Sequence, residues 1–162
     1  MKKQIVVLGF LGTNLDQGGK ARWGRWRPTI SLGQQDDLLV DRLELFYEKS
    51  FLELAQLVQK DFQQVSPETV FNLREVVLKD PWDFQTVYSG IFDNLKDYKF
   101  DTDNEEYLVH ITTGTHVIQI CLFLLTESRH IPGKLLQTHM QKSRNPNGTY
   151  TIIDLDLSKY DK

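Results

Sequence analysis

A hydroxyl-rich turn carries the residue types best suited to hold an anion: Thr112, Thr113, Gly114, Thr115 and His116. The turn separates a short apolar strand expected at residues 107–111 from an apolar run at residues 117–125 that has the length of a helix. The first backbone N–H groups of a helix lack partners within it, and the helix dipole places a partial positive charge there. Combined with the hydroxyls, these groups predict a phosphate-binding turn.

A second turn follows the first expected strand, at residues 5–8, and combines small residues with a hydroxyl: Gly9, Phe10, Leu11, Gly12 and Thr13. In open parallel sheets, ligands bind beyond the carboxyl ends of the strands, at the point where strand order reverses. Because this point commonly lies beside the first strand, we expect the two turns to line one cleft.

A basic and aromatic segment at residues 20–27 lies in the long loop after the first strand and contains Arg22, Trp23, Trp26 and Arg27. Arginine grips phosphate with a planar fork of donors and tryptophan stacks on nucleobases, so the segment has the chemistry of a clamp for single-stranded nucleic acid. Equally, the loop can fold its tryptophans onto the domain and leave the arginines in solvent. The sequence leaves both interpretations open.

Strands and helices alternate along the chain. Further strands are expected at residues 39–47, 70–78, 135–140 and 150–157, with a polar turn at residues 142–148. One helix is marked by apolar residues at helical spacing: Phe51, Leu54, Ala55, Val58 and Phe62. Another is expected to begin with Asp80 as N-cap and Pro81 at its first position. We therefore predict a three-layer, Rossmann-like α/β domain with a mostly parallel sheet of about six strands.

Composition excludes several classes of protein. Of the 162 residues, 40% are hydrophobic and 25% are charged, as in an ordinary soluble domain. The 19 Lys and Arg residues and 22 Asp and Glu residues give a net charge of -3, which argues against a broad basic surface that contacts DNA. No apolar run reaches the roughly twenty residues that span a bilayer. The single cysteine, Cys121, excludes an internal disulfide and suits a reducing cytoplasm.

Several familiar motifs are incomplete. Residues 14–21 contain the Gly-Lys pair of a P-loop but lack its first glycine and its Ser/Thr, and residues 9–12 are too short for a dinucleotide fingerprint. His110 and His116 have no cysteine or close carboxylate to complete a metal site, so we predict no metal and no cofactor. Asp154 and Asp156 share one face of the last expected strand, which keeps a metal-dependent nuclease as an alternative.

The apolar run at residues 117–125 contains one polar residue, Gln119. One sheet face does not cover a helix that is apolar all round, so a second buried surface is needed. We expect that surface to be the interface of a homodimer formed through the helix at residues 117–125. The alternative is that the helix is buried within the domain.

Seven stretches of the chain match, in order, the pattern of a known family: residues 9–13, 22–29, 41–45, 66–69, 81–84, 110–116 and 151–158. Through them the chain resembles, nearly end to end, the amino-terminal sensor domain of the RtcR family. RtcR-like proteins are bacterial sigma-54-dependent activators of the RNA-repair operon, which encodes an RNA ligase and an RNA terminal-phosphate cyclase. Their sensor belongs to the CARF group, named for the CRISPR-associated Rossmann fold.

This resemblance implies a dimeric domain that binds an RNA-derived ligand, such as a cyclic oligoadenylate or a cleaved RNA end, at the turns after the first and fourth strands. It places Gly9, Gly12 and Thr13 beside the ligand backbone and assigns residues 112–115 to phosphate or ribose contacts. Many CARF domains carry a basic residue shortly after the fourth-strand turn, where this chain has Gln119 and Ile120. The positive charge is therefore expected from elsewhere.

The resemblance also sets expectations for the whole protein and its activity. Residues 1–162 are expected to form one sensor domain, continued in the full-length protein by an AAA+ ATPase and a helix-turn-helix DNA-binding domain. A sensor without catalytic activity is favoured. The alternative is an enzyme that cleaves its RNA ligand in the same cleft, with His116 or a threonine hydroxyl assisting proton transfer. A third possibility is an interaction module that binds no small ligand.

Overall fold

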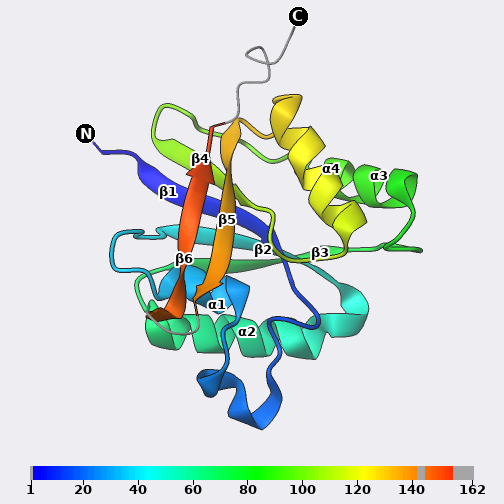
Figure 1. Ribbon diagram of the computed structural model, residues 1–162. Helices are drawn as coiled ribbons and strands as arrows, with labels where there is room; N and C mark the ends of the chain where they lie inside the picture. Colours follow the sequence, from blue (N-terminus) through cyan, green and yellow to red (C-terminus); the bar gives the residue numbers. More distant parts are fainter. Residues whose placement is uncertain (1, 142–144, 155–162) are drawn as a thin grey trace, which may run out of the picture.

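One six-stranded sheet, with strand order β3-β2-β1-β4-β5-β6, organises the chain in the computed structural model (Figure 1). The structure describes residues 2–141 and 145–154. The strands are β1 (Gln4–Phe10), β2 (Arg42–Glu48), β3 (Val70–Val76), β4 (Glu105–His110), β5 (Gly133–Gln141) and β6 (Asn145–Ile153). The α-helices are α1 (Pro28–Gly33), α2 (Leu52–Val65), α3 (Phe84–Leu95) and α4 (His116–Glu127), with short 3-10 helices η1 (Gly19–Gly24) and η2 (Lys49–Phe51).

The strand order reverses beside β1. This strand pairs in parallel with β2 on one side and with β4 on the other, and β5 extends the parallel arrangement. The edge strand β6 is antiparallel to β5. The chain thus builds β1, β2 and β3 outward and then returns to place β4 on the other side of β1, which opens a crevice beyond their carboxyl ends. The mostly parallel, six-stranded α/β sheet predicted from the sequence is confirmed.

Helices cover both faces of the sheet, with α3 and α4 on one face and α1 and α2 on the other (Figure 1). In β1, Val6, Leu8 and Phe10 pack in the core under α3 and α4, whereas Val7 packs in the core under α1 and α2. All four side chains are buried, and burying an aliphatic side chain stabilises a fold by about 1.5–3 kcal/mol. The continuous apolar run therefore forms the central strand of a three-layer domain.

The start of α3 differs from the prediction. Asp83, not Asp80, is the N-cap, and its carboxylate accepts hydrogen bonds from the backbone N–H (3.0 Å) and the hydroxyl (2.7 Å) of Thr86. Asp80 instead accepts from the backbone N–H of Trp82 at 2.9 Å, within the preceding turn. The N-cap lies at Asp83 rather than Asp80 because Thr86, three residues after Asp83, supplies two donors to its carboxylate. Pro81 therefore remains in the connecting loop.

The last hairpin also differs from the prediction. The polar turn expected at residues 142–148 is wrong from residue 145 onward, because β6 begins at Asn145. Gly148 sits within β6 at a φ of 74°, close to a register shift at His139 and Gln141 in β5. A bulge of this kind accommodates polar and glycine residues inside a paired edge strand, which hides the strand from pattern analysis. Residues 155–157, expected to end this strand, lie outside the described residues.

The other predicted elements are present with shifted ends. The second strand begins at Arg42 rather than residue 39, and Leu39 is exposed before it. The third strand ends at Val76 rather than residue 78. The apolar run at residues 117–125 becomes the longer helix α4. In the part of the chain that the structure describes, every helix is too short or too polar to cross a bilayer.

Candidate ligand-binding pocket

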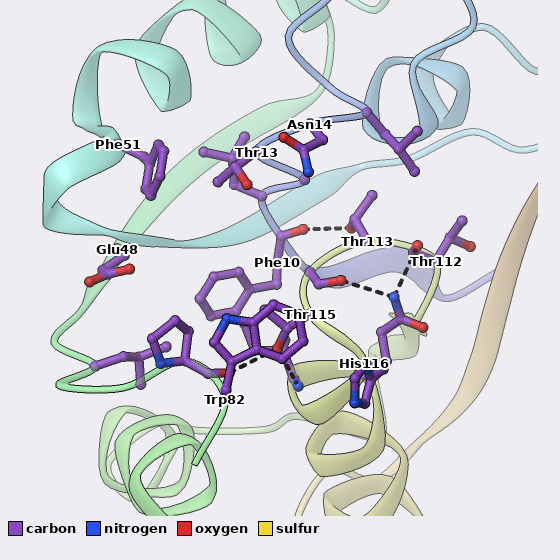
Figure 2. Close-up of a pocket in the computed structure, with 18 residues that line it drawn as sticks. Phe10, Thr13, Asn14, Glu48, Phe51, Trp82, Thr112, Thr113, Thr115 and His116 are labelled. Carbon is purple, nitrogen blue, oxygen red and sulfur yellow. Dashed lines mark hydrogen bonds between the residues drawn. The ribbon is translucent and has the colours of Figure 1, made fainter. Parts of the chain in front are cut away.

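A pocket of about 410 Å³ opens where the carboxyl ends of β1 and β4 meet (Figure 2). Its volume lies within the range of sites that hold small molecules. It brings together most of the residues predicted from the two turns: Phe10, Leu11, Gly12, Thr13, Thr112, Thr113, Gly114, Thr115 and His116. Gly9 is absent from its lining, because Gly9 is buried within β1 against the His110 side chain.

The two turns are tied together by Thr113. Its hydroxyl is buried and donates a hydrogen bond of 2.5 Å to the carbonyl oxygen of Phe10 (Figure 2). Gly12 completes the contact, since a Cβ at this position would lie 2.8 Å from Thr113 Cγ2. Thr113 therefore holds the β1 loop against the β4 turn, and its hydroxyl is already engaged before any ligand arrives.

The remaining hydroxyls of the turn also have partners. Thr115 caps α4 by accepting from the backbone N–H of Ile118 at 3.1 Å, and it donates to the Pro81 carbonyl at 2.9 Å. Thr112 accepts from the backbone N–H of Thr138 at 2.9 Å. The Gln119 amide donates to the Gly114 carbonyl at 3.0 Å and so fixes the turn from the helix side. The threonines thus give the turn its shape.

Two backbone N–H groups at the start of α4 are available to a ligand. The backbone N–H of Ile118 donates to the Thr115 hydroxyl, and the backbone N–H of Gln119 donates to the Thr115 carbonyl. The N–H groups of His116 and Val117, in the first turn of α4, have no acceptor among the described residues. A helix N-terminus with two available amides and a dipole of favourable sign suits a phosphate or another anion.

The pocket lining holds no lysine or arginine among the described residues. Among residues 2–141 and 145–154, Glu48 at the end of β2 is the one acidic side chain that lines it. The first turn of α4 contributes a partial positive charge at the pocket, and Gln119 stands where the resemblance leads one to expect a basic residue.

The basic and aromatic segment lies away from this pocket. Arg22 and Arg27 both pair with Asp61 of α2, at 2.6 Å and 2.9 Å, and Arg27 is almost fully buried. Burial raises the pKa of the Asp61 carboxyl, but the hydrogen bonds and charges of the two guanidinium groups outweigh burial and hold it below its usual range. The Trp23 ring packs 5.0 Å from the Arg27 guanidinium carbon.

The other tryptophan of the segment packs against the last hairpin. A Cβ on Gly148 would lie 2.5 Å from Trp26 Nε1, which shows how closely the indole approaches β6. The interpretation that the tryptophans fold onto the domain is therefore right for Trp26, whereas the accompanying expectation of solvated arginines is wrong for Arg27. None of Arg22, Trp23, Trp26 and Arg27 lines the pocket.

Sequence analysis missed Asp16, which organises the β1 loop. Its buried carboxylate accepts from the backbone N–H groups of Gly12 (2.8 Å) and Thr29 (2.9 Å) and from the Thr29 hydroxyl (2.7 Å). Burial raises the pKa of Asp16, and these hydrogen bonds oppose the shift. The sequence offered no periodic signal for this residue, because a loop carboxylate looks the same whether it is buried or solvated.

The pocket lining extends beyond both predicted turns, and among the added residues are Glu48, Phe51 and Trp82. Glu48 ends β2, Phe51 precedes α2, and Trp82 lies between β3 and α3. The carboxyl ends of all parallel strands lie at one edge of a sheet, so the rule that found the two turns also applies after the second and third strands. Applied there, the rule would have found these residues.

The two histidines near the turn are in different surroundings. His110 is buried, its Nε2 lies 2.9 Å from Thr138 Oγ1, and burial lowers its pKa to about 3. His116 is exposed and its ring meets the Trp82 ring edge-on at 5.3 Å between centroids. Within residues 2–141 and 145–154, no three His, Cys, Asp or Glu side chains come together as a metal site.

The sequence is similar to a described family over almost its whole length. The family model for "Regulator of RNA terminal phosphate cyclase" matches residues 3–162. The chain is also 46% identical, over 163 residues, to the transcriptional regulatory protein RtcR of Escherichia coli K12. This match covers 98% of the chain but 31% of the relative's length.

Solved structures share the fold at low sequence identity. Csm6 of Enterococcus italicus, bound to cyclic hexa-2′-fluoro-hexa-dAMP, is similar with a TM-score of 0.74 and 14% identity, over 95% of this chain and 43% of that one. Can2 of Sulfobacillus thermosulfidooxidans, in complex with cyclic tetra-adenylate, is similar with a TM-score of 0.59 and 16% identity, over 91% of this chain and 36% of that one. VC1899 of Vibrio cholerae is similar with a TM-score of 0.54 and 12% identity, over 91% of this chain and 35% of that one. The expected CARF-like fold is confirmed.

Proposed function

Since the chain belongs to the RtcR family of regulators of RNA terminal phosphate cyclase, we propose that residues 1–162 form the sensor domain of a sigma-54-dependent activator of RNA repair. In this proposal, the pocket between β1 and β4 binds an RNA-derived ligand, either a cleaved RNA end or a cyclic oligoadenylate. Binding controls an AAA+ ATPase in the same polypeptide. A transcription activator of this kind acts in the bacterial cytoplasm.

The position and donor set of the pocket carry this proposal. It lies at the strand-order reversal, and His116 in its lining begins α4, where the N–H groups of His116 and Val117 have no acceptor among the described residues and suit an anion. Phosphate is the anion that every RNA-derived ligand supplies. The complexes of Csm6 and Can2 with cyclic oligonucleotides support the same ligand class for a domain of this fold.

The ligand class is tested by thermal unfolding of the purified domain with a panel of nucleotides. The panel contains cyclic oligoadenylates and RNAs that end in a 2′,3′-cyclic phosphate, a 3′-phosphate or a hydroxyl. A ligand at a hundred times its Kd adds about 2.7 kcal/mol of stability, which raises the Tm of a domain of this size by about 5 °C or more. If no member of the panel shifts the Tm, the domain is an interaction module instead.

We also propose that the domain senses its ligand without cleaving it. The hydroxyls of Thr113 and Thr115 already donate to the backbone carbonyls of Phe10 and Pro81, so neither is poised to give a proton to a reacting ligand. Incubation with end-labelled ligand separates the two functions. Intact ligand after prolonged incubation supports a sensor, and shorter products support a nuclease.

A homodimer through α4 completes the proposal. Ile118, Cys121, Leu122 and Leu125 bury one side of α4 against the domain, but Ile120 and Leu124 on the other side stay 47% and 37% exposed. A second copy of the chain would cover these two side chains. Light scattering should give a dimer for the wild type and a monomer for Ile120→Glu. Equal masses for the two proteins would refute this interface.

A further inference from the structure

One part of the pocket wall differs chemically from the two turns. Glu48, Phe51 and Trp82 come from other loops of the chain and supply a carboxylate and two aromatic rings. In the view of Figure 2, Glu48 and Phe51 lie on the side of Phe10 away from Thr112. The pocket therefore combines the amides at the first turn of α4 with aromatic side chains and a carboxylate.

Trp82 is held in place at the pocket while most of its surface stays uncovered. The preceding Pro81 carbonyl accepts from Thr115 Oγ1 at 2.9 Å, and the Trp82 backbone N–H donates to Asp80 at 2.9 Å. The ring also meets His116 edge-on. Despite these contacts, Trp82 is 59% exposed. A large aromatic ring fixed at a pocket and open to solvent is suited to stack on a flat ligand group.

Glu48 is half-buried in the same wall. The ion pairs found among residues 2–141 and 145–154 do not include it. A carboxylate accepts hydrogen bonds and repels phosphate, so it suits the part of a ligand that carries N–H donors. In a nucleotide, those donors lie on the edge of the base.

We propose that Trp82 and Glu48 form a nucleobase subsite beside the phosphate-binding turn, with Trp82 stacking on the base and Glu48 accepting from its amino group. The subsite rests on the proposed function, because it serves the same nucleotide ligand. Guanine, adenine and cytosine each offer an amino group to the carboxylate. Uracil offers one N–H flanked by two carbonyl oxygens, which a carboxylate repels. The subsite therefore accepts amino-bearing bases and discriminates against uracil.

Calorimetric titration with the four nucleoside 2′,3′-cyclic monophosphates, at millimolar concentrations, tests the subsite. These probes share one sugar and one phosphate and differ in the base alone. The wild type should bind the uridine nucleotide about tenfold more weakly than the others. Trp82→Leu should weaken binding of all four by about tenfold, and Trp82→Phe should retain most of the affinity. Glu48→Gln should abolish the discrimination against uridine.

Matched controls come from the same chain. Trp23→Leu removes another exposed tryptophan that does not line the pocket, and Glu53→Gln neutralises an exposed glutamate in α2. Both should bind all four nucleotides as the wild type does. If Trp82→Leu and Glu48→Gln also behave as the wild type, the subsite is refuted while the proposed function stands. If the wild type binds neither these nucleotides nor any RNA of the thermal panel, both are refuted.

Discussion

Two segments that follow neighbouring strands, the β4 turn and residues 20–27, have the residue types of a nucleotide site, yet they differ in what their polar groups contact. The β4 turn faces an open pocket, and the backbone amides of His116 and Val117 have no acceptor among the described residues. In residues 20–27, Arg22 and Arg27 face inward to Asp61. Guanidinium chemistry serves a phosphate and a buried carboxylate equally well, so side-chain type alone does not separate a binding segment from a structural one.

The two segments are expected to respond differently to substitution. Changes in residues 20–27 and at Asp61 should alter stability and leave ligand affinity intact, and changes around the β4 turn should alter affinity. In each affinity measurement, the ligand is the panel member that gives the largest rise in Tm.

The largest effect is expected for Asp61→Ala. This change leaves the buried Arg27 guanidinium without its carboxylate, which should lower the free energy of unfolding by about 3–5 kcal/mol. Urea denaturation measures the loss, and Asp93→Ala, at an exposed position of α3, is the matched control. The folded fraction of Asp61→Ala should keep its ligand affinity. Full stability combined with lost binding would place residues 20–27 in the ligand site.

The next effect is a pH dependence of stability that arises at His110, directly before the β4 turn. Burial lowers its pKa to about 3 in the folded state, against 6.5 for the ordinary side chain. Below pH 6.5 the unfolded chain therefore binds a proton that the folded state does not, and stability falls as the pH falls from 6.5 towards 3. At pH 5 the loss is about 2 kcal/mol relative to pH 8.

His110→Gln should remove that part of the pH dependence, measured by urea unfolding between pH 5 and pH 8. Asp61 also makes stability fall as the pH falls, although its carboxylate loses a negative charge on protonation whereas a histidine gains a positive one. The lowered pKa of Asp61 stabilises the fold above the ordinary value of 3.8 and loses this contribution as the pH falls further. The loss that arises at His110 therefore begins at a higher pH than the loss that arises at Asp61. An identical slope in the wild type and His110→Gln would contradict the assignment to His110.

A smaller loss of stability, with a distinct loss of binding, is expected for Thr113→Val. The change keeps the shape of the side chain but leaves the buried Phe10 carbonyl without its donor, at a cost of about 1–2 kcal/mol. Because this bond ties the β1 loop to the β4 turn, ligand affinity should fall as well. Thr113→Ser keeps the hydroxyl and should retain affinity. Unchanged affinity in Thr113→Val would show that the link between the turns is not needed for binding.

The smallest effect is expected for Arg22→Ala. The Arg22 side chain is 25% exposed, and Arg27 still pairs with Asp61 after its removal, so the loss should be about 0.5–1 kcal/mol. Ligand affinity, measured by calorimetry, should not change. A tenfold loss of affinity would show that Arg22 leaves Asp61 to bind the ligand.

The sheet and the position of the pocket were predictable from the sequence, because the apolar strands and the intervening helix patterns are strong local signals. The contacts of residues 20–27 were not, since they depend on a partner far along the chain. A signal was nevertheless present at Asp61, which falls three residues after Val58 on the buried stripe of α2. A lone carboxylate on such a stripe predicts a buried cation.

Other details were decided by single hydrogen bonds that no periodicity reveals. The cap of α3 moved to Asp83 because Thr86 supplies two donors, and Thr113 turned its hydroxyl to Phe10 rather than to the pocket. The hairpin at β6 was hidden by a bulge beside Gly148. These are local choices between partners of similar chemistry, and they are fixed by the packing of the whole domain.

The most direct test of the difference between the two segments is the change in backbone and arginine N–H resonances of the 15N-labelled domain as ligand is added. Donation by the first turn of α4 predicts that the amides of His116 and Val117 shift most. The side-chain Nε–H groups of Arg22 and Arg27 should stay unchanged. The largest shifts at residues 22–27, with His116 and Val117 unaffected, would contradict the assignment of the pocket.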